Sequence, residues 1–167
     1  LDLNPQGLIP TLEINGQVLV QSMAIIEYLD ETQPTPALLP SDPFERARIR
    51  ALAQITGCEM HPINNKRVRE FITNDLGLSH ETLITWMGHW NALGFESLEA
   101  MLVDSPYTGK FCHGDYPTMA DVYLVPQLDL ARRFKIDVSK RLKFKWDKFY
   151  LIELIEKYKE LNKKPHG

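Results

Sequence analysis

An Asn-Gly dipeptide between two short β-rich runs is the feature that most constrains this chain. Asn15 and Gly16 separate TLEI, residues 11–14, from VLV, residues 18–20. Asn-Gly favours the two-residue turn of a β-hairpin, because both residues accept positive φ angles. A lone two-stranded hairpin is marginally stable at best, so other elements must cover it. We therefore predict an α+β fold that the chain enters midway, with other strands expected before Leu1.

Pro10 stands directly before the first predicted strand. It has no N–H to donate to a strand ladder, so it belongs at the entry of the strand or in a tight turn. The Ile9–Pro10 bond is a candidate cis peptide, an isomer that is almost confined to X-Pro bonds. A cis bond would leave the backbone amide and carbonyl of Ile9 facing outward, free to pair with an extended ligand.

The residues after the hairpin predict a helix. Apolar residues recur at helical spacing from Met23 to Leu29, and Ser22 suits the N-cap position. A helix N-terminus offers unpaired N–H groups and positive partial charge, which favour a carboxylate ligand. The alternative interpretation is that Ser22 only caps the helix and that Gln21 is a polar surface residue.

Four prolines lie within residues 33–43, QPTPALLPSDP. That composition is typical of an extended, stiff linker and indicates a domain boundary. We predict a hairpin module at residues 1–32, the linker at residues 33–43, and an all-helical domain at residues 44–167.

Capping signals and apolar periodicity predict the helices of the second domain. A first helix begins with Ser41 or Asp42 as its cap, and Pro62 kinks or ends it, because proline removes a backbone donor. A long helix covers residues 81–103. Its two glycines, Gly88 and Gly94, are expected to permit close helix packing.

Two further helices are predicted toward the C-terminus. Thr118 and Asp121 have the spacing of a capping box, with Asp in place of the usual Glu or Gln. The helix that follows contains Pro126, which implies a kink. The lysine-rich segment after Ser139 ends in an amphipathic pattern, FYLIELIEKYKEL, that predicts a last helix.

Composition excludes several classes of function. A net charge of −3 and a pI near 6.0 argue against nucleic acid as a partner. No apolar run approaches the length of a membrane span, so we expect no membrane partner. Cys58 and Cys112 lie far apart, which fits a reducing cytoplasm. Cys58 shares a helix face with His61, but no second ligand pair accompanies them, so we predict no metal site. His89, between two tryptophans, is expected to serve helix packing.

Several separated motifs together resemble one family. NPQGLIPTLEINGQVLVQSMAIIEYLDE resembles the second half of the thioredoxin-like domain of a glutathione transferase. GKFCHGDYPTMADVYLVPQLDLARRFKID, HPINNKRV and WMGHWNALGFESLE resemble the helical domain of the zeta class. The resemblance covers residues 1–138 and implies a partial thioredoxin-like domain followed by an all-helical glutathione transferase domain.

The resemblance assigns roles to five residues. In this family the proline before the third strand is cis, and the residue before it binds the cysteinyl part of glutathione, which implies this role for Ile9 and Pro10. The Gln/Glu-Ser pair binds the γ-glutamyl end, which implies that role for Gln21 and Ser22. An arginine in the family's ERFKVD stretch borders the substrate pocket, and the matching residue is Arg133, for which a surface or interdomain salt bridge is the alternative. Cys112 lies in a family-like loop and is expected to be structural.

The family implies a function and leaves two gaps. Zeta members act as maleylacetoacetate isomerases, in which glutathione adds to a cis double bond and leaves after rotation to give fumarylacetoacetate. Their serine-rich motif, which stabilises the thiolate, has no counterpart in these residues, so the catalytic residue stays unassigned. The segment after KIDVS also departs from the family. We expect a cytoplasmic homodimer that uses glutathione as cofactor on a small acidic substrate; the alternative is a non-catalytic binding or regulatory module of the same fold.

Overall fold

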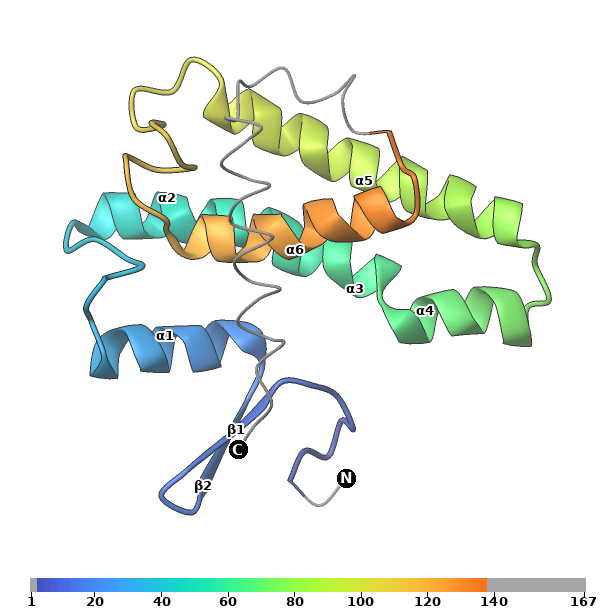
Figure 1. Cartoon of the computed structure of the whole chain (residues 1–167), viewed down its shortest axis with the longest axis horizontal. Helices are drawn as coiled ribbons and strands as arrows, with labels where there is room; N and C mark the ends of the chain where they lie inside the picture. Colours follow the sequence, from blue (N-terminus) through green and yellow to red (C-terminus); the bar gives the residue numbers. More distant parts are fainter. Residues whose placement is uncertain (1–2, 138–167) are drawn as a thin grey trace.

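A computed structural model describes residues 3–137 of the chain. The predicted amphipathic C-terminal helix and the lysine-rich segment lie outside the described residues. Figure 1 shows a β-hairpin and helix α1 below a layer formed by α2 and α6, with α5 on the other side of that layer. The described part is thus α+β, with one small sheet beside a larger helical body.

The predicted hairpin is confirmed. Strand β1, Thr11–Ile14, pairs antiparallel with β2, Gln17–Val20, so that Thr11 lies opposite Val20. Asn15 and Gly16 form the turn with φ angles of 51° and 75°, as a two-residue hairpin turn with both φ positive requires. The second strand begins one residue earlier than its β-rich run indicates.

Helix α1, Ser22–Thr32, follows the hairpin and joins it to the helical body. Its inner face places Met23 and Ile26 against the main hydrophobic core. Glu27 also forms an ion pair with Arg50 of α2 at 2.5 Å. The hairpin region therefore shares its core and an ion pair with the helical body.

The first helix of the body changes from α-helical to π-helical geometry before Pro62. Helix α2, Pro43–Gln54, begins at the predicted cap Asp42, whose carboxylate accepts a hydrogen bond from the N–H of Glu45. It continues as a π-helical segment, η1, Ile55–Met60, and then as α3, His61–Asn64, with Pro62 in its first turn. Because Pro62 has no N–H to donate, the predicted disturbance is observed as a widened helix rather than a clean end.

The remaining elements complete the helical body. They are α4, Lys66–Glu70; a second π-helical segment, η2, Phe71–Asp75; α5, His80–Leu102; and α6, Met119–Arg133. Helix α6 continues through Pro126, and Asp121 in its first turn accepts a hydrogen bond from the backbone N–H of Thr118, as the capping box predicts. The main core lies between α2, η1, α5 and α6 and includes the buried side chains of Ile49, Leu52, Met60, Phe95, Leu98, Met119 and Leu124.

Of the two glycines in α5, only one is a close-packing position. A Cβ at Gly94 would lie 2.3 Å from Met60 Cγ and Sδ, whereas a Cβ at Gly88 would meet nothing within 4 Å. The prediction is therefore confirmed for Gly94 and wrong for Gly88, which lies on a more open part of the helix surface.

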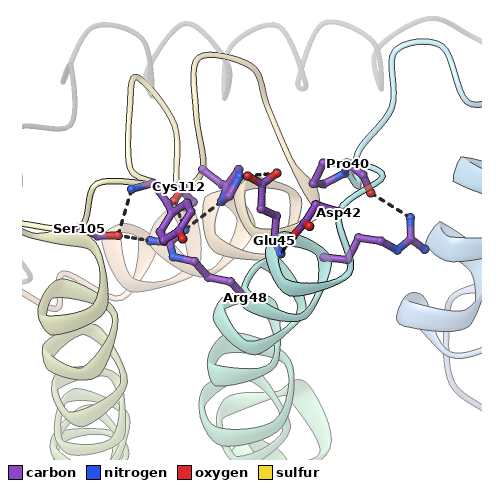
Figure 2. Close-up of polar contacts among 9 residues, drawn as sticks. Pro40, Asp42, Glu45, Arg48, Ser105 and Cys112 are labelled. Carbon is purple, nitrogen blue, oxygen red and sulfur yellow. Dashed lines mark hydrogen bonds and ion pairs between the residues drawn. The ribbon is translucent and has the colours of Figure 1, made fainter.

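The long loop between α5 and α6 is fastened to α2 by one arginine. The guanidinium of Arg48 donates to the carbonyl of Cys112 and to the hydroxyl of Ser105 (Figure 2), and also to the hydroxyl of Thr108, each at 3.0 Å. Burial lowers the pKa of Arg48, and the oxygen acceptors offset the loss of hydration. The loop is thus part of the fold through contacts distant in sequence.

Candidate functional site

The predicted site residues gather at one end of the hairpin. Because Thr11 lies opposite Val20, the residues just outside that pair, Pro10 and Gln21, flank the same end. Ile9 precedes Pro10 and Ser22 follows Gln21, so the structure brings all four together. The sequence alone suggested this only through the hairpin register.

Ile9 is presented to solvent in an unusual way for a large apolar residue. The residue is 94% exposed, and the Ile9–Pro10 bond, named above as a candidate, is cis. Ile9 lies outside the β1–β2 ladder, and within residues 3–137 its backbone makes no hydrogen bond to another backbone group. Its N–H and carbonyl are therefore open to an extended ligand, which would add main-chain hydrogen bonds at this edge.

The prediction that Ser22 is the N-cap of α1 is wrong. Ser22 is the first residue of the helix, and Gln21 occupies the N-cap position with φ 73° and ψ 125°. The carbonyl of Gln21 accepts the first intrahelical hydrogen bond, from the N–H of Ile25 at 3.1 Å. A non-glycine residue at such angles is rare and clusters at ligand-binding sites. The preference of serine for N-cap positions did not predict this helix start. The fold instead holds Gln21 there, in a backbone region that a non-glycine residue rarely adopts.

The N-terminus of α1 differs from those of the other long described helices. It has no side-chain cap and no acidic residue in its first turn. By contrast, α2 has Glu45 in its first turn, and α5 and α6 likewise begin with Glu81 and Asp121. The first N–H groups of α1, which have no intrahelical acceptor, can therefore receive an anion together with the positive end of the helix dipole.

Two residues that the sequence analysis did not single out belong to this site. Gln21 Nε2 donates to Gln6 Oε1 at 2.8 Å, and the N–H of Gln6 donates to Oδ1 of the buried Asn4 at 3.0 Å. The turn-forming sequence Asn-Pro-Gln-Gly indicated a loop here. It could not indicate that Gln6 meets a residue fifteen positions away.

Arg133 lies at the C-terminal end of α6. Its Nε and Nη2 donate to Oδ2 of Asp129 one turn earlier, with 2.7 Å for the Nε bond. Its side chain is 71% exposed. Burial lowers the pKa of Arg69, and the nearby charge of Arg133 lowers it further. The surface ion pair named as the alternative is thus present within residues 3–137, and the substrate-binding role of Arg133 stays a prediction.

Cys112 and His89 make contacts that serve packing and the fold. Cys112 is buried and its N–H donates to Asp121 Oδ1 at 3.0 Å; burial and the nearby carboxylate raise the pKa of its thiol, which makes it unreactive. His89 meets Trp90 edge to face at 5.0 Å. Across residues 3–137, no cluster of three or more His, Cys, Asp or Glu side chains could hold a metal ion.

Comparisons with known proteins match this arrangement. Residues 1–32 match the family model "Glutathione S-transferase, N-terminal domain". A maleylpyruvate isomerase from Ralstonia sp. is 50% identical over 137 residues, which cover 82% of this chain and 65% of that protein. A solved maleylpyruvate isomerase, described as a bacterial zeta-class glutathione S-transferase, is 49% identical with a TM-score of 0.80, covering 84% of this chain and 66% of that one.

Two further solved structures extend the match. The glutathione S-transferase of Legionella pneumophila is 38% identical with a TM-score of 0.76, covering 90% of this chain and 75% of that one. The maleylacetoacetate isomerase of Anaeromyxobacter dehalogenans, solved with glutathione in its active site, is 42% identical with a TM-score of 0.72, covering 83% of this chain and 63% of that one. The chain belongs to the zeta class of glutathione S-transferases.

The chain spans 65% of the length of its Ralstonia relative. No helix among the described residues is both long and apolar enough to cross a membrane.

Proposed function

We propose that this zeta-class transferase is a glutathione-dependent cis–trans isomerase that converts maleylacetoacetate to fumarylacetoacetate. The proposal rests on the N-terminus of α1, which lies beside the open backbone of Ile9. This helix start has no side-chain cap and no acidic residue in its first turn. Glutathione is an extended peptide with a carboxylate at its γ-glutamyl end, so it fits both features at once. The glutathione bound in the Anaeromyxobacter relative supports the same fit.

Each residue of the site has a defined task in this proposal. The N–H groups at the start of α1 and the hydroxyl of Ser22 hold the γ-glutamyl carboxylate by charge-assisted hydrogen bonds. The backbone of Ile9 holds the cysteinyl part, with its direction set by Pro10. Glutathione supplies a thiol, whose reversible addition to a conjugated double bond permits rotation about that bond. Arg133 is suited to hold a carboxylate of the acidic substrate, because a guanidinium binds carboxylates bidentately.

Calorimetric binding of glutathione tests the site itself. Ser22→Ala should raise the dissociation constant on the order of 10-fold, since it removes a hydrogen bond to a charged group. Ser97→Ala is the matched control, because Ser97 is an exposed helical serine whose hydroxyl donates to the carbonyl of Leu93 in the preceding turn. Equal affinities for both variants would contradict the assigned role of Ser22, and no binding by the unaltered protein would overturn the proposal.

An isomerase assay then separates catalysis from mere binding. With maleylacetoacetate as substrate, turnover should exceed the amount of glutathione added, because an isomerase regenerates its cofactor. S-methylglutathione should bind but support no reaction, since it has no free thiol. Glutathione binding without turnover would favour the alternative, a non-catalytic binding or regulatory module. Faster turnover of maleylpyruvate than of maleylacetoacetate would reassign the substrate, as the name of the Ralstonia relative suggests.

We also propose that the protein is a cytoplasmic homodimer. Cys58 and Cys112 are both free, which suits a reducing compartment. Sedimentation equilibrium should give twice the mass of one chain at micromolar concentration. A monomer mass across that range would contradict the dimer, and a periplasmic or secreted location of the tagged protein would contradict the compartment.

A further inference from the structure

The segment before the hairpin is organised by one buried side chain. Asn4 is 6% exposed. Its Oδ1 accepts from the N–H of Gln6 at 3.0 Å, and its Nδ2 donates to the carbonyl of Leu8 at 2.6 Å. Its own carbonyl accepts from the N–H of Gly7 at 2.9 Å. Asn4 therefore fixes the backbone of residues 6–8, directly before Ile9.

From this fixed position, Gln6 reaches across to Gln21. The bond from Gln21 Nε2 to Gln6 Oε1 measures 2.8 Å. The backbone of Gln21 is also fixed, because it lies between β2 and α1 at φ 73°. A side-chain amide has a donor end and an acceptor end. Gln6 engages the donor end of Gln21, which leaves Oε1 of Gln21 as an acceptor on the opposite side.

We propose that Gln6 is a positioning residue for glutathione, holding the Gln21 amide with its oxygen toward the ligand's α-ammonium group. This inference rests on the proposed function. The γ-glutamyl end carries an ammonium group as well as a carboxylate. The N–H groups of α1 satisfy the carboxylate, and the ammonium group needs an acceptor beside them. The terminal torsion of a glutamine is broad, so without Gln6 the amide could turn its NH₂ group toward the ammonium.

A double-mutant cycle read by calorimetry tests the proposal on the full chain. Gln6→Ala should raise the dissociation constant of glutathione roughly 3- to 10-fold, the effect expected for one misdirected hydrogen bond to a charged group. In a Gln21→Glu background the same change should have less than about 2-fold effect, because a carboxylate presents acceptor oxygens in either orientation. A merely structural role of Gln6 would instead weaken binding equally in both backgrounds.

Two more variants sharpen the cycle. Gln6→Glu keeps the acceptor for Gln21 Nε2 and should retain the original affinity within about 2-fold at 1 M salt, where a Debye length of about 3 Å screens the added charge. Gln17→Ala is the matched control, since it removes an exposed glutamine from β2, away from this contact. Thermal unfolding of every variant checks that the fold is intact.

The outcomes are distinct. The proposal is supported if Gln6→Ala weakens glutathione binding in the unaltered protein but not in the Gln21→Glu background, and if Gln6→Glu restores the affinity. Equal losses in both backgrounds, or no loss in either, overturn it while leaving the glutathione site in place. Absence of glutathione binding by the unaltered chain overturns the proposed function instead.

Discussion

The N-termini of α1 and α6 satisfy their backbone groups in opposite ways. At α6, the buried Asp121 accepts hydrogen bonds from the N–H groups of Thr118 and Cys112 and from the hydroxyl of Thr118. At α1, no side chain caps the helix, and the N-cap residue Gln21 takes an unfavourable backbone conformation. The first arrangement satisfies buried donors within the fold, whereas the second leaves the first N–H groups of α1 without a side-chain acceptor among residues 3–137. The difference fits a stabilising helix start at α6 and the proposed ligand-binding start at α1.

The largest effect is expected at the α6 start. Asp121→Ala should lower the free energy of unfolding by about 2–4 kcal/mol, because it leaves buried donors without an acceptor. Asp42→Ala, at the exposed cap of α2, should cost only about 1 kcal/mol. Urea unfolding measures both. Equal losses would show that burial does not separate the two caps.

The next largest effect on stability is expected where α5 packs against η1. Gly94→Ala should destabilise by about 1–3 kcal/mol, because its methyl group would overlap the buried side chain of Met60. Gly88→Ala should be neutral or stabilise by up to about 1 kcal/mol, since alanine is the better helix former and the space is open. Thermal unfolding of the pair checks this, and the same sign for both would contradict the assigned contact.

A carboxylate placed at the α1 start should turn it into an α6-like terminus. Ala24→Glu should stabilise the fold by about 0.3–1 kcal/mol through the helix dipole. It should also weaken glutathione binding on the order of 10-fold, because the new charge repels the ligand's carboxylate. Ala47→Glu in the middle of α2 provides the same charge without a helix terminus. Stability and affinity that change in the same direction would contradict the division between the two termini.

The smallest effect on stability is expected at the end of α6. Arg133→Ala and Asp129→Asn both remove an ion pair whose arginine side chain is 71% exposed and whose aspartate side chain is 14% exposed, so each should change the free energy of unfolding by only about 1 kcal/mol. Only Arg133→Ala should raise KM for the acidic substrate, on the order of 10-fold, if the guanidinium binds its carboxylate. Equal KM values in the two variants would reduce Arg133 to a surface ion pair.

Local patterns predicted much of the fold. The Asn15-Gly16 turn, the cap at Asp42 and the Asp121 part of the capping box are all present, because each depends on residues within three positions of one another. The long helix was also predicted, within a residue at either end. Such features need no knowledge of the remainder of the chain.

The errors and omissions arise where distant residues decide. Ser22 is a good N-cap by type, but the chain places Gln21 there instead. Pro62 predicted a disturbed helix but not the π-helical form of η1, and η2 lies beyond that proline with no sequence signal for it. The Gln6–Gln21 bond and the contacts of Arg48 with the 105–112 loop join residues far apart in sequence. The resemblance named four of the site residues, but only the structure showed how Gln21 is held.

Helix α1 connects the proposed glutathione site to the hydrophobic core, and this has an energetic consequence. Its N-terminal end is the proposed ligand-binding end, while Met23 and Ile26 pack against the same core as α2, α5 and α6, and Glu27 forms an ion pair with Arg50. A ligand that binds only the folded chain adds its free energy to the whole cooperative unit, about 2.7 kcal/mol at a concentration of 100 times its dissociation constant. If glutathione binds as proposed, its removal would therefore lower the free energy of unfolding of the helical body as well as empty the site.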